Sequence, residues 1–194
     1  MTLTEMVYGI LFQPVSTLQY LSREKPLSRA MLVFVSVLLF NTLVNQAISM
    51  ANIEELPFSL PVNLLWLFGL MGIIFSILLL FLTAGFFSLL SEVFFGRANA
   101  SGLLVCLGFA SVPGILGPPL QYAAILIKLP AGVVLFPLIS IVWVMILQVM
   151  ALRESLELDT GKAILLYIFP LLLVILFLAI ITASFISSFP FAEL

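Results

Sequence analysis

The chain has 194 residues, of which 63% are hydrophobic and 8% charged, and its net charge is −2. This composition leaves too little polar surface for a water-soluble domain and gives no basis for nucleic-acid binding. Between Leu56 and Ser91 there is no charged residue, whereas a helix needs about 20 apolar residues to cross a bilayer. The sequence therefore predicts an all-α polytopic membrane protein that contacts the lipid bilayer.

The residue types also restrict the chemistry. The chain has no histidine and a single cysteine, Cys106, which excludes histidine zinc sites, Ser-His nucleophiles and an intramolecular disulfide. No pair of carboxylates lies within an apolar stretch, and no glycine-rich phosphate loop is present. We therefore predict no catalytic residue, no metal site and no cofactor.

Residues 1–29 form an amphipathic segment ahead of the first apolar stretch. Leu3, Met6 and Ile10 recur at helical spacing, and Pro14 interrupts the pattern. Such a segment is expected in the cytoplasmic interface with its apolar face toward the lipid. Two interpretations remain open, a sensor of lipids or partners and an anchoring helix that caps the bundle.

Five membrane spans make up a predicted transmembrane domain at residues 30–187, followed by a short tail at 188–194. The first could instead be a cleaved signal peptide, because Ala47-Ile48-Ser49 resembles a cleavage site. The 29 residues that precede it and its two asparagines favour a span. The predicted spans are 30–49, 61–90, 102–127, 132–152 and 162–186.

The basic residues predict the orientation. Six of the seven fall on one side of the spans, and only Lys128 falls on the other. Since basic loops stay in the cytoplasm, we expect a cytoplasmic N-terminus and an extracytoplasmic C-terminus.

Prolines predict a break in the third span and, beside it, a possible cavity. Each proline removes a backbone donor and disfavours helix just before it. Whether residues 118–127 complete the span or lie flat in the interface stays open. The residues concerned are Pro113, Gly117, Pro118 and Pro119.

Small residues recur every four positions in the third and fifth spans. This spacing lets a neighbouring backbone approach closely, which drives helix packing in lipid. Cys106 is then a small apolar spacer. The predicted packing residues are Gly102, Cys106, Ala110 and Gly114 in the third span and Ala179 and Ala183 in the fifth.

Asn41 and Asn45 in the first span and Gln148 in the fourth are polar residues at membrane depth. Such amides usually bond across helices, each contributing about 1 kcal/mol. They could alternatively line a path for a solute. Because every charged residue lies at a span end or in a loop, an ion-coupled transporter is disfavoured, whereas passage of a neutral solute stays open.

Several segments form a familiar order. They are Phe12-Gln13-Pro14 before the first span, Gly108-Phe109-Ala110-Ser111-Val112-Pro113 in the third, Trp143 in the fourth, and Ala151-Leu152, Leu158 and Lys162-Ala163 around the last loop. Together they resemble the YIP family of Ypt/Rab-interacting membrane proteins. The resemblance implies a five-helix bundle with a cytoplasmic N-terminus.

Eukaryotic members of that family are associated with small GTPases and vesicle traffic. They carry a longer hydrophilic N-terminal region that this chain lacks, which argues against small-GTPase binding. The short form is similar to prokaryotic members, for which the family implies a location in the plasma membrane. We therefore expect a non-enzymatic scaffold that binds a second copy or another membrane protein through helix–helix contacts. The alternative is a small channel or transporter for a neutral or lipid-like solute that uses the broken third span.

Overall fold

The computed structural model describes residues 1–51 and 62–188, and every regular element in these ranges is helical. Five helical stretches are long and apolar enough to cross a membrane, which confirms the prediction of an all-α polytopic bundle. Residues 189–194 of the predicted tail lie outside the described part. The elements are α1 (Leu3–Phe12), α2 (Pro14–Glu24), α3 (Leu27–Ala51), α4 (Val62–Phe95), α5 (Ala100–Ala110), η2 (Val112–Leu116), α6 (Gly117–Leu126), α7 (Pro130–Ser155) and α8 (Thr160–Ser188).

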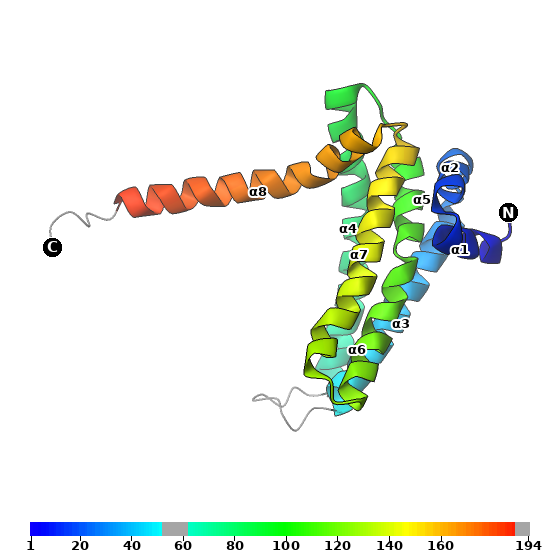
Figure 1. Ribbon diagram of the computed structural model, residues 1–194, viewed down its shortest axis with the longest axis vertical. Coiled ribbons are helices and arrows are strands. Elements are labelled where there is room, and N and C mark those ends of the chain that lie inside the picture. The colour runs from blue at the N-terminus through cyan, green and yellow to red at the C-terminus, as the bar shows by residue number, and fades with distance from the viewer. Residues whose placement is uncertain (52–61, 189–194) are drawn as a thin grey trace.

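The third span, Ala100–Leu126, lies at the centre of the bundle. It is 67% buried over its most apolar stretch, against 6–22% for the other four spans. Every residue from Gly102 to Ala110 is buried, and α5 packs against α2, α3, α4 and α7. Figure 1 shows α3, α4, α5–α6 and α7 running side by side. The outer faces of the surrounding helices are therefore left to the lipid.

The two N-terminal helices pack on the protein. Thr2 and Glu5 form a capping box at the start of α1, with the Thr2 N–H donating to Glu5 Oε2 at 2.8 Å. Met6, Ile10 and Leu18 are fully buried because α1 lies on α2, and α2 on α5 and α7. The expectation that this apolar face points toward lipid is corrected. The segment is amphipathic, but its apolar face is covered by the third and fourth spans of the protein instead of lipid.

The predicted break divides the third span. The helix α5 ends at Ala110, η2 follows as a 3-10 helix, and α6 begins at Gly117. Pro113 and Pro118 have no N–H to donate to a preceding carbonyl, which favours an interruption of the regular helix at this point and suits Pro118 to the first turn of α6. Figure 1 shows α6 continuing beside α7 to the far end of the bundle. Residues 118–126 thus continue the span.

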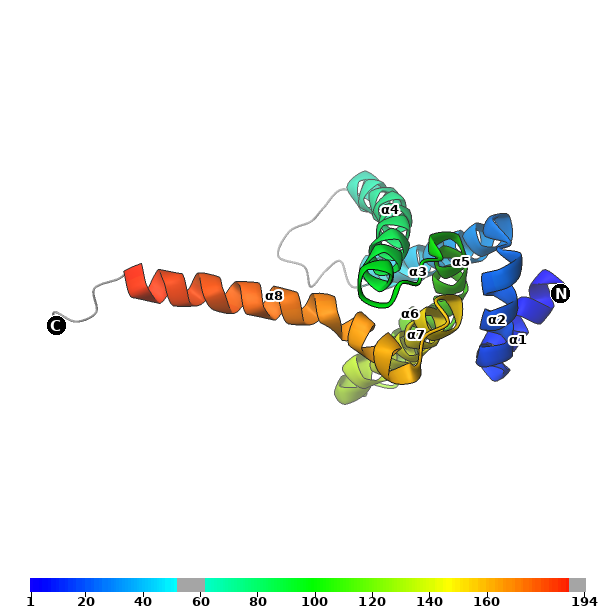
Figure 2. The same cartoon turned by 90° about the horizontal axis from the view of Figure 1, so that it is seen from above.

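The last helix leaves the bundle. Ala163 and Leu166 near its start are buried, whereas every side chain from Leu171 to Thr182 is exposed. Figures 1 and 2 show α8 projecting away from the other helices at a large angle. The change in environment falls at Pro170, inside the helix, where a backbone hydrogen bond is lost.

Candidate functional site at the break in the third span

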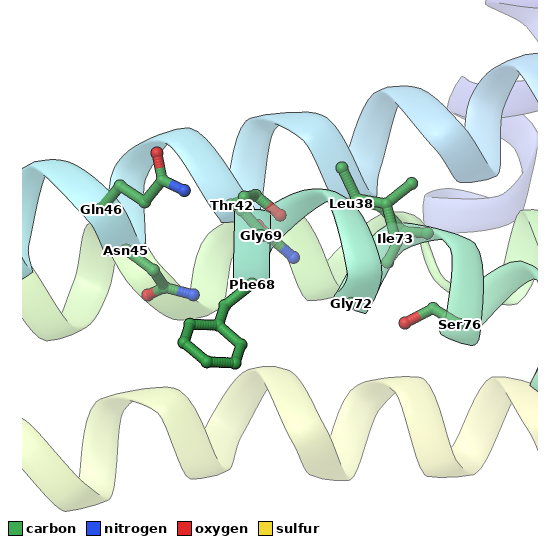
Figure 3. A pocket seen from close by; sticks show the side chains of 10 residues that line it. Leu38, Thr42, Asn45, Gln46, Phe68, Gly69, Gly72, Ile73 and Ser76 are labelled. Carbon is green, nitrogen blue, oxygen red and sulfur yellow. The ribbon is translucent and has the colours of Figure 1, made fainter. Parts of the chain in front are cut away.

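Two cavities flank α3 in the half of the bundle that contains the break. The first, here called the α3–α4 cavity, has a volume of about 380 Å³. Figure 3 shows Thr42 beside Gly69, where α3 and α4 approach each other, with Asn45 and Ser76 toward opposite ends of the cavity. Its lining residues are Leu38, Asn41, Thr42, Asn45, Gln46, Phe68, Gly69, Gly72, Ile73 and Ser76.

The second cavity, here called the break cavity, lies beside η2, α6 and α7 and has a volume of about 460 Å³. Asn45 lines both cavities, so the two lie on either side of this residue of α3. The other lining residues are Gly114, Gly117, Pro118, Gln121, Pro137, Ser140, Ile141, Val144, Met145 and Gln148.

Side chains from two neighbouring helices satisfy the carbonyls that the break exposes. The Ser140 hydroxyl on α7 donates to the carbonyl of Pro113 at 2.7 Å, and the Asn41 amide on α3 donates to the carbonyl of Gly114 at 3.2 Å. In lipid an unpaired carbonyl costs several kcal/mol. These two side chains therefore make an irregular backbone tolerable at membrane depth.

One acceptor at this site is unused within the described residues. The Asn41 Oδ1 atom is buried and has no hydrogen-bond partner, while the Nδ2 atom of the same side chain holds the Gly114 carbonyl. Asn41 lines the α3–α4 cavity, but its Oδ1 atom has almost no accessible surface. A guest molecule with a hydroxyl or N–H group could therefore donate to it once the neighbouring side chains shift slightly.

The cavities are polar but uncharged. The side chains that line them in the described part of the chain carry amide and hydroxyl groups together with apolar groups, and none is ionisable. Such a lining can hold a neutral molecule by hydrogen bonds, whereas an ion would remain without a compensating charge. The chemistry available here is binding.

The structure places the predicted packing residues in three settings. Gly102, Cys106 and Ala110 are buried inside α5, with the Cys106 thiol 3.5 Å from the Leu18 carbonyl of α2. Gly114 lines the break cavity. The predicted ridge on α8 lies on the projecting part, where Ala179 is exposed; the side chain of Ala183 lies outside the described residues.

Most of the predicted polar and break residues line the cavities, whereas Pro113 and Pro119 do not. Asn41 and Asn45 line them, as do Gly117 and Pro118. Pro113 is buried and takes part through its carbonyl. Pro119 lines neither cavity.

Gln148 links the break cavity to α8. It accepts a hydrogen bond from the Tyr167 hydroxyl at 2.7 Å and also lines a third cavity, the α4–α7 groove, of about 1100 Å³. Apolar side chains of α4, α7 and the first half of α8 form most of this groove, among them Phe87, Ile146 and Leu171. The groove shares Met145 and Gln148 with the break cavity, so the two adjoin at these side chains.

Sequence reasoning missed two residues of the site. In the sequence, Ser140 is a single hydroxyl residue within an apolar run. This isolated polar group is the only local signal that could have indicated its role. Gly69 marks a close approach of α3 and α4, which no local pattern around it indicates. A Cβ atom added there would lie 2.6 Å from Gln46 Nε2 and 2.8 Å from Thr42 Cγ2.

At the opposite end, here called the charged end, polar contacts join the helices. Arg97 pairs with Glu157 at 2.8 Å, and the Asn99 amide donates to the Ser155 carbonyl at 3.0 Å. The Gln19 amide of α2 donates to Glu154 Oε2 at 2.7 Å, and Arg153 also pairs with this carboxylate. These contacts fix α2, the α4–α5 turn and the end of α7 to one another.

A multi-pass helical bundle with a broken central span and uncharged cavities between its helices defines the class as a polytopic membrane protein. The Yip1 domain matches residues 8–181, which include all five candidate spans except the last residue of the fifth. The chain therefore belongs to the Yip1 domain family. No curated protein and no solved structure matches it.

Proposed function

We propose that this protein is a non-enzymatic scaffold that organises membrane proteins through helix–helix contacts, with α8 as the contacting element. The observation that carries the proposal is the projection of α8 from the bundle. All side chains from Leu171 to Thr182 are exposed, and this part of the helix has no charged residue. A second membrane helix could therefore approach it from any side.

Small residues determine which face of such a helix can pack closely against a second helix. Burying an apolar side chain against protein instead of lipid brings little gain, so close packing drives association in a bilayer. Ala179 lies one helical turn before Ala183, which gives one narrow ridge. The Thr182 hydroxyl bonds to the Leu178 and Ala179 carbonyls at 2.9 and 3.0 Å, so its polarity is already satisfied within the helix.

The basic residues support a topology for this scaffold. We propose that the charged end lies in the cytoplasm of a prokaryotic cell and that the C-terminus lies across the plasma membrane. This topology requires α8 to turn at Pro170 from the direction seen in Figure 1 until it crosses the bilayer beside the other spans. Arg97, Arg153 and Lys162 are all at this end, at the end of α4, the end of α7 and the start of α8. The positive-inside rule favours the cytoplasmic side for it.

The test measures assembly in lipid. The purified protein is placed in lipid nanodiscs, and the oligomer size is measured by mass photometry. We expect an assembly larger than one chain, and Ala179→Leu should weaken it by about tenfold in the association constant. Ile181→Phe, a similar enlargement two residues away, is the matched control and should leave it unchanged. A wild-type monomer that captures no stoichiometric membrane partner would contradict the proposal.

A second candidate function is transport of a neutral solute, which the cavities beside the break favour. Irregular backbone at membrane depth often lines a binding site in transporters. In this structure α5, the buried half of the third span, fills the charged end of the bundle. Transport would therefore require a second conformation. Uptake of a neutral solute such as glycerol into proteoliposomes, abolished by Gly117→Leu, would favour this function over the scaffold.

A further inference from the structure

The depth of the cavities in the bilayer limits what can bind there. Asn45 follows Arg29 by 16 residues, or about 24 Å along α3 at about 1.5 Å per residue. Gln121 precedes Lys128 by 7 residues. If Arg29 marks one surface of a hydrocarbon layer about 30 Å thick, Asn45 lies a few ångströms inside the other. Asn45 is therefore close to the level where the polar groups of lipids begin, and Asn41, 12 residues after Arg29 and so about 18 Å from it, lies about one helical turn deeper.

The amide groups of Asn41 and Asn45, just below the polar surface of the bilayer, suit an uncharged headgroup. Asn41 Oδ1 is a buried acceptor without a partner among the described residues, and Asn45 lies between the two cavities. Ionisable side chains are absent from both linings as far as the structure describes them. A phosphate would lose its hydration here without a compensating cation, whereas a hydroxyl would gain an acceptor.

The apolar surfaces continue from these amides. Ile141 and Val144 line the break cavity, and Met145 belongs to both that cavity and the α4–α7 groove of about 1100 Å³. Phe68 and Ile73 provide a similar surface in the α3–α4 cavity. Hydrocarbon chains can therefore extend from the amides along the groove toward the charged end, where Arg153 and Thr160 also line it.

We propose that the two cavities and the groove bind a lipid whose headgroup is an uncharged hydroxyl, of the diacylglycerol class. The hydroxyl donates to Asn41 Oδ1, the ester carbonyls lie near the Asn45 amide, and an acyl chain occupies the α4–α7 groove. The two polar cavities take no residue from α8, and the groove takes only Leu171 and Val174 from its contacting part. Ala179, the ridge residue that the scaffold test replaces, lies outside the whole site, so the lipid site can be tested separately from the scaffold function.

The chain offers a matched pair of variants for the test. A Cβ added at Gly72 or at Gly85 meets no atom within 4 Å, so a larger side chain is tolerated at either position of α4. Only Gly72 lines the α3–α4 cavity. Gly72→Leu therefore fills the site, whereas Gly85→Leu makes the same change outside it.

The experiment uses the full chain in phosphatidylcholine nanodiscs with a photoactivatable diacylglycerol. We expect labelled peptides from α3, α4 or α7 and competition by unlabelled dioleoylglycerol but not by phosphatidylglycerol. Gly72→Leu should reduce labelling at least tenfold, and Gly85→Leu should leave it unchanged.

Equal labelling by photoactivatable phosphatidylglycerol, or labelling that Gly72→Leu does not reduce, would show ordinary contact with surrounding lipid and overturn the proposal. Thermal unfolding of both variants shows whether they are folded. If Gly72→Leu fails to fold, Gly72→Ala is used, with a smaller decrease expected and an unchanged signal contradicting the site. Oligomer size, measured on the same samples, distinguishes failure of this site from failure of the scaffold function.

Discussion

The two halves of the third span differ in how their backbone and side chains are accommodated inside the bundle. Toward the charged end, α5 is a regular helix with every residue from Gly102 to Ala110 buried. Beyond Ala110 the backbone is irregular, and side chains of α3 and α7 pair with its carbonyls. The first half is filled by close packing, whereas the second contains cavities that can accept a guest. Stability and binding capacity are thus separated along one span.

The largest expected effect comes from overfilling the packed half. Ala110 is fully buried, so Ala110→Leu forces its neighbours apart and should lower the free energy of unfolding by about 1–3 kcal/mol or more. Gly114 belongs to the same predicted ridge, but an added Cβ would lie 3.7 Å from Val144 Cγ2, an ordinary contact. Gly114→Ala should therefore change the stability little. Unfolding in dodecyl sulfate micelles measures both, and equal losses would remove the contrast between the halves.

A smaller effect should follow from removing the hydroxyl that supports the break. Ser140→Ala leaves the Pro113 carbonyl without its 2.7 Å hydrogen bond and should cost about 1 kcal/mol of unfolding free energy. Ser36→Ala, at an exposed position on α3, is the control for loss of a hydroxyl. The same titration in dodecyl sulfate compares the two, and a Ser140→Ala variant as stable as the control would show that the break needs no support.

The smallest effect is expected at the surface of the charged end. The Arg97 and Glu157 side chains are 54% and 71% exposed, so solvent screens their attraction. Arg97→Ala should cost less than about 1 kcal/mol, and the difference from wild type should shrink further in high salt. Thermal unfolding in low and high salt tests this. A loss as large as that of Ala110→Leu would mean that charge pairing, not packing, holds this half together.

Sequence patterns predicted the spans because the surrounding lipid requires a particular residue composition of any helix that crosses it. A bilayer requires long apolar helices whatever their neighbours are, so hydropathy alone located all five candidate spans. The break was predictable for a similarly local reason, since a missing backbone donor is a property of Pro113 and Pro118 themselves.

What the sequence left open depends on neighbours. The apolar face of α2 could be covered by lipid or protein, and its pattern is the same in both cases. The role of Ser140 requires the Pro113 carbonyl to lie opposite it, 27 residues away in the chain. The direction of α8 was not predictable because a helix that is apolar all round has no face to specify its partner.

The single thiol of the chain, Cys106, can report local opening of the folded protein. Cys106 is fully buried with its thiol beside the Leu18 carbonyl of α2, so an alkylating reagent can reach it only when the packing around α5, of which the N-terminal pair is one part, opens. The rate of its modification in native membranes would therefore read out the free energy of that local opening. Any ligand or partner that tightens the N-terminal pair would slow the reaction, without a single engineered residue.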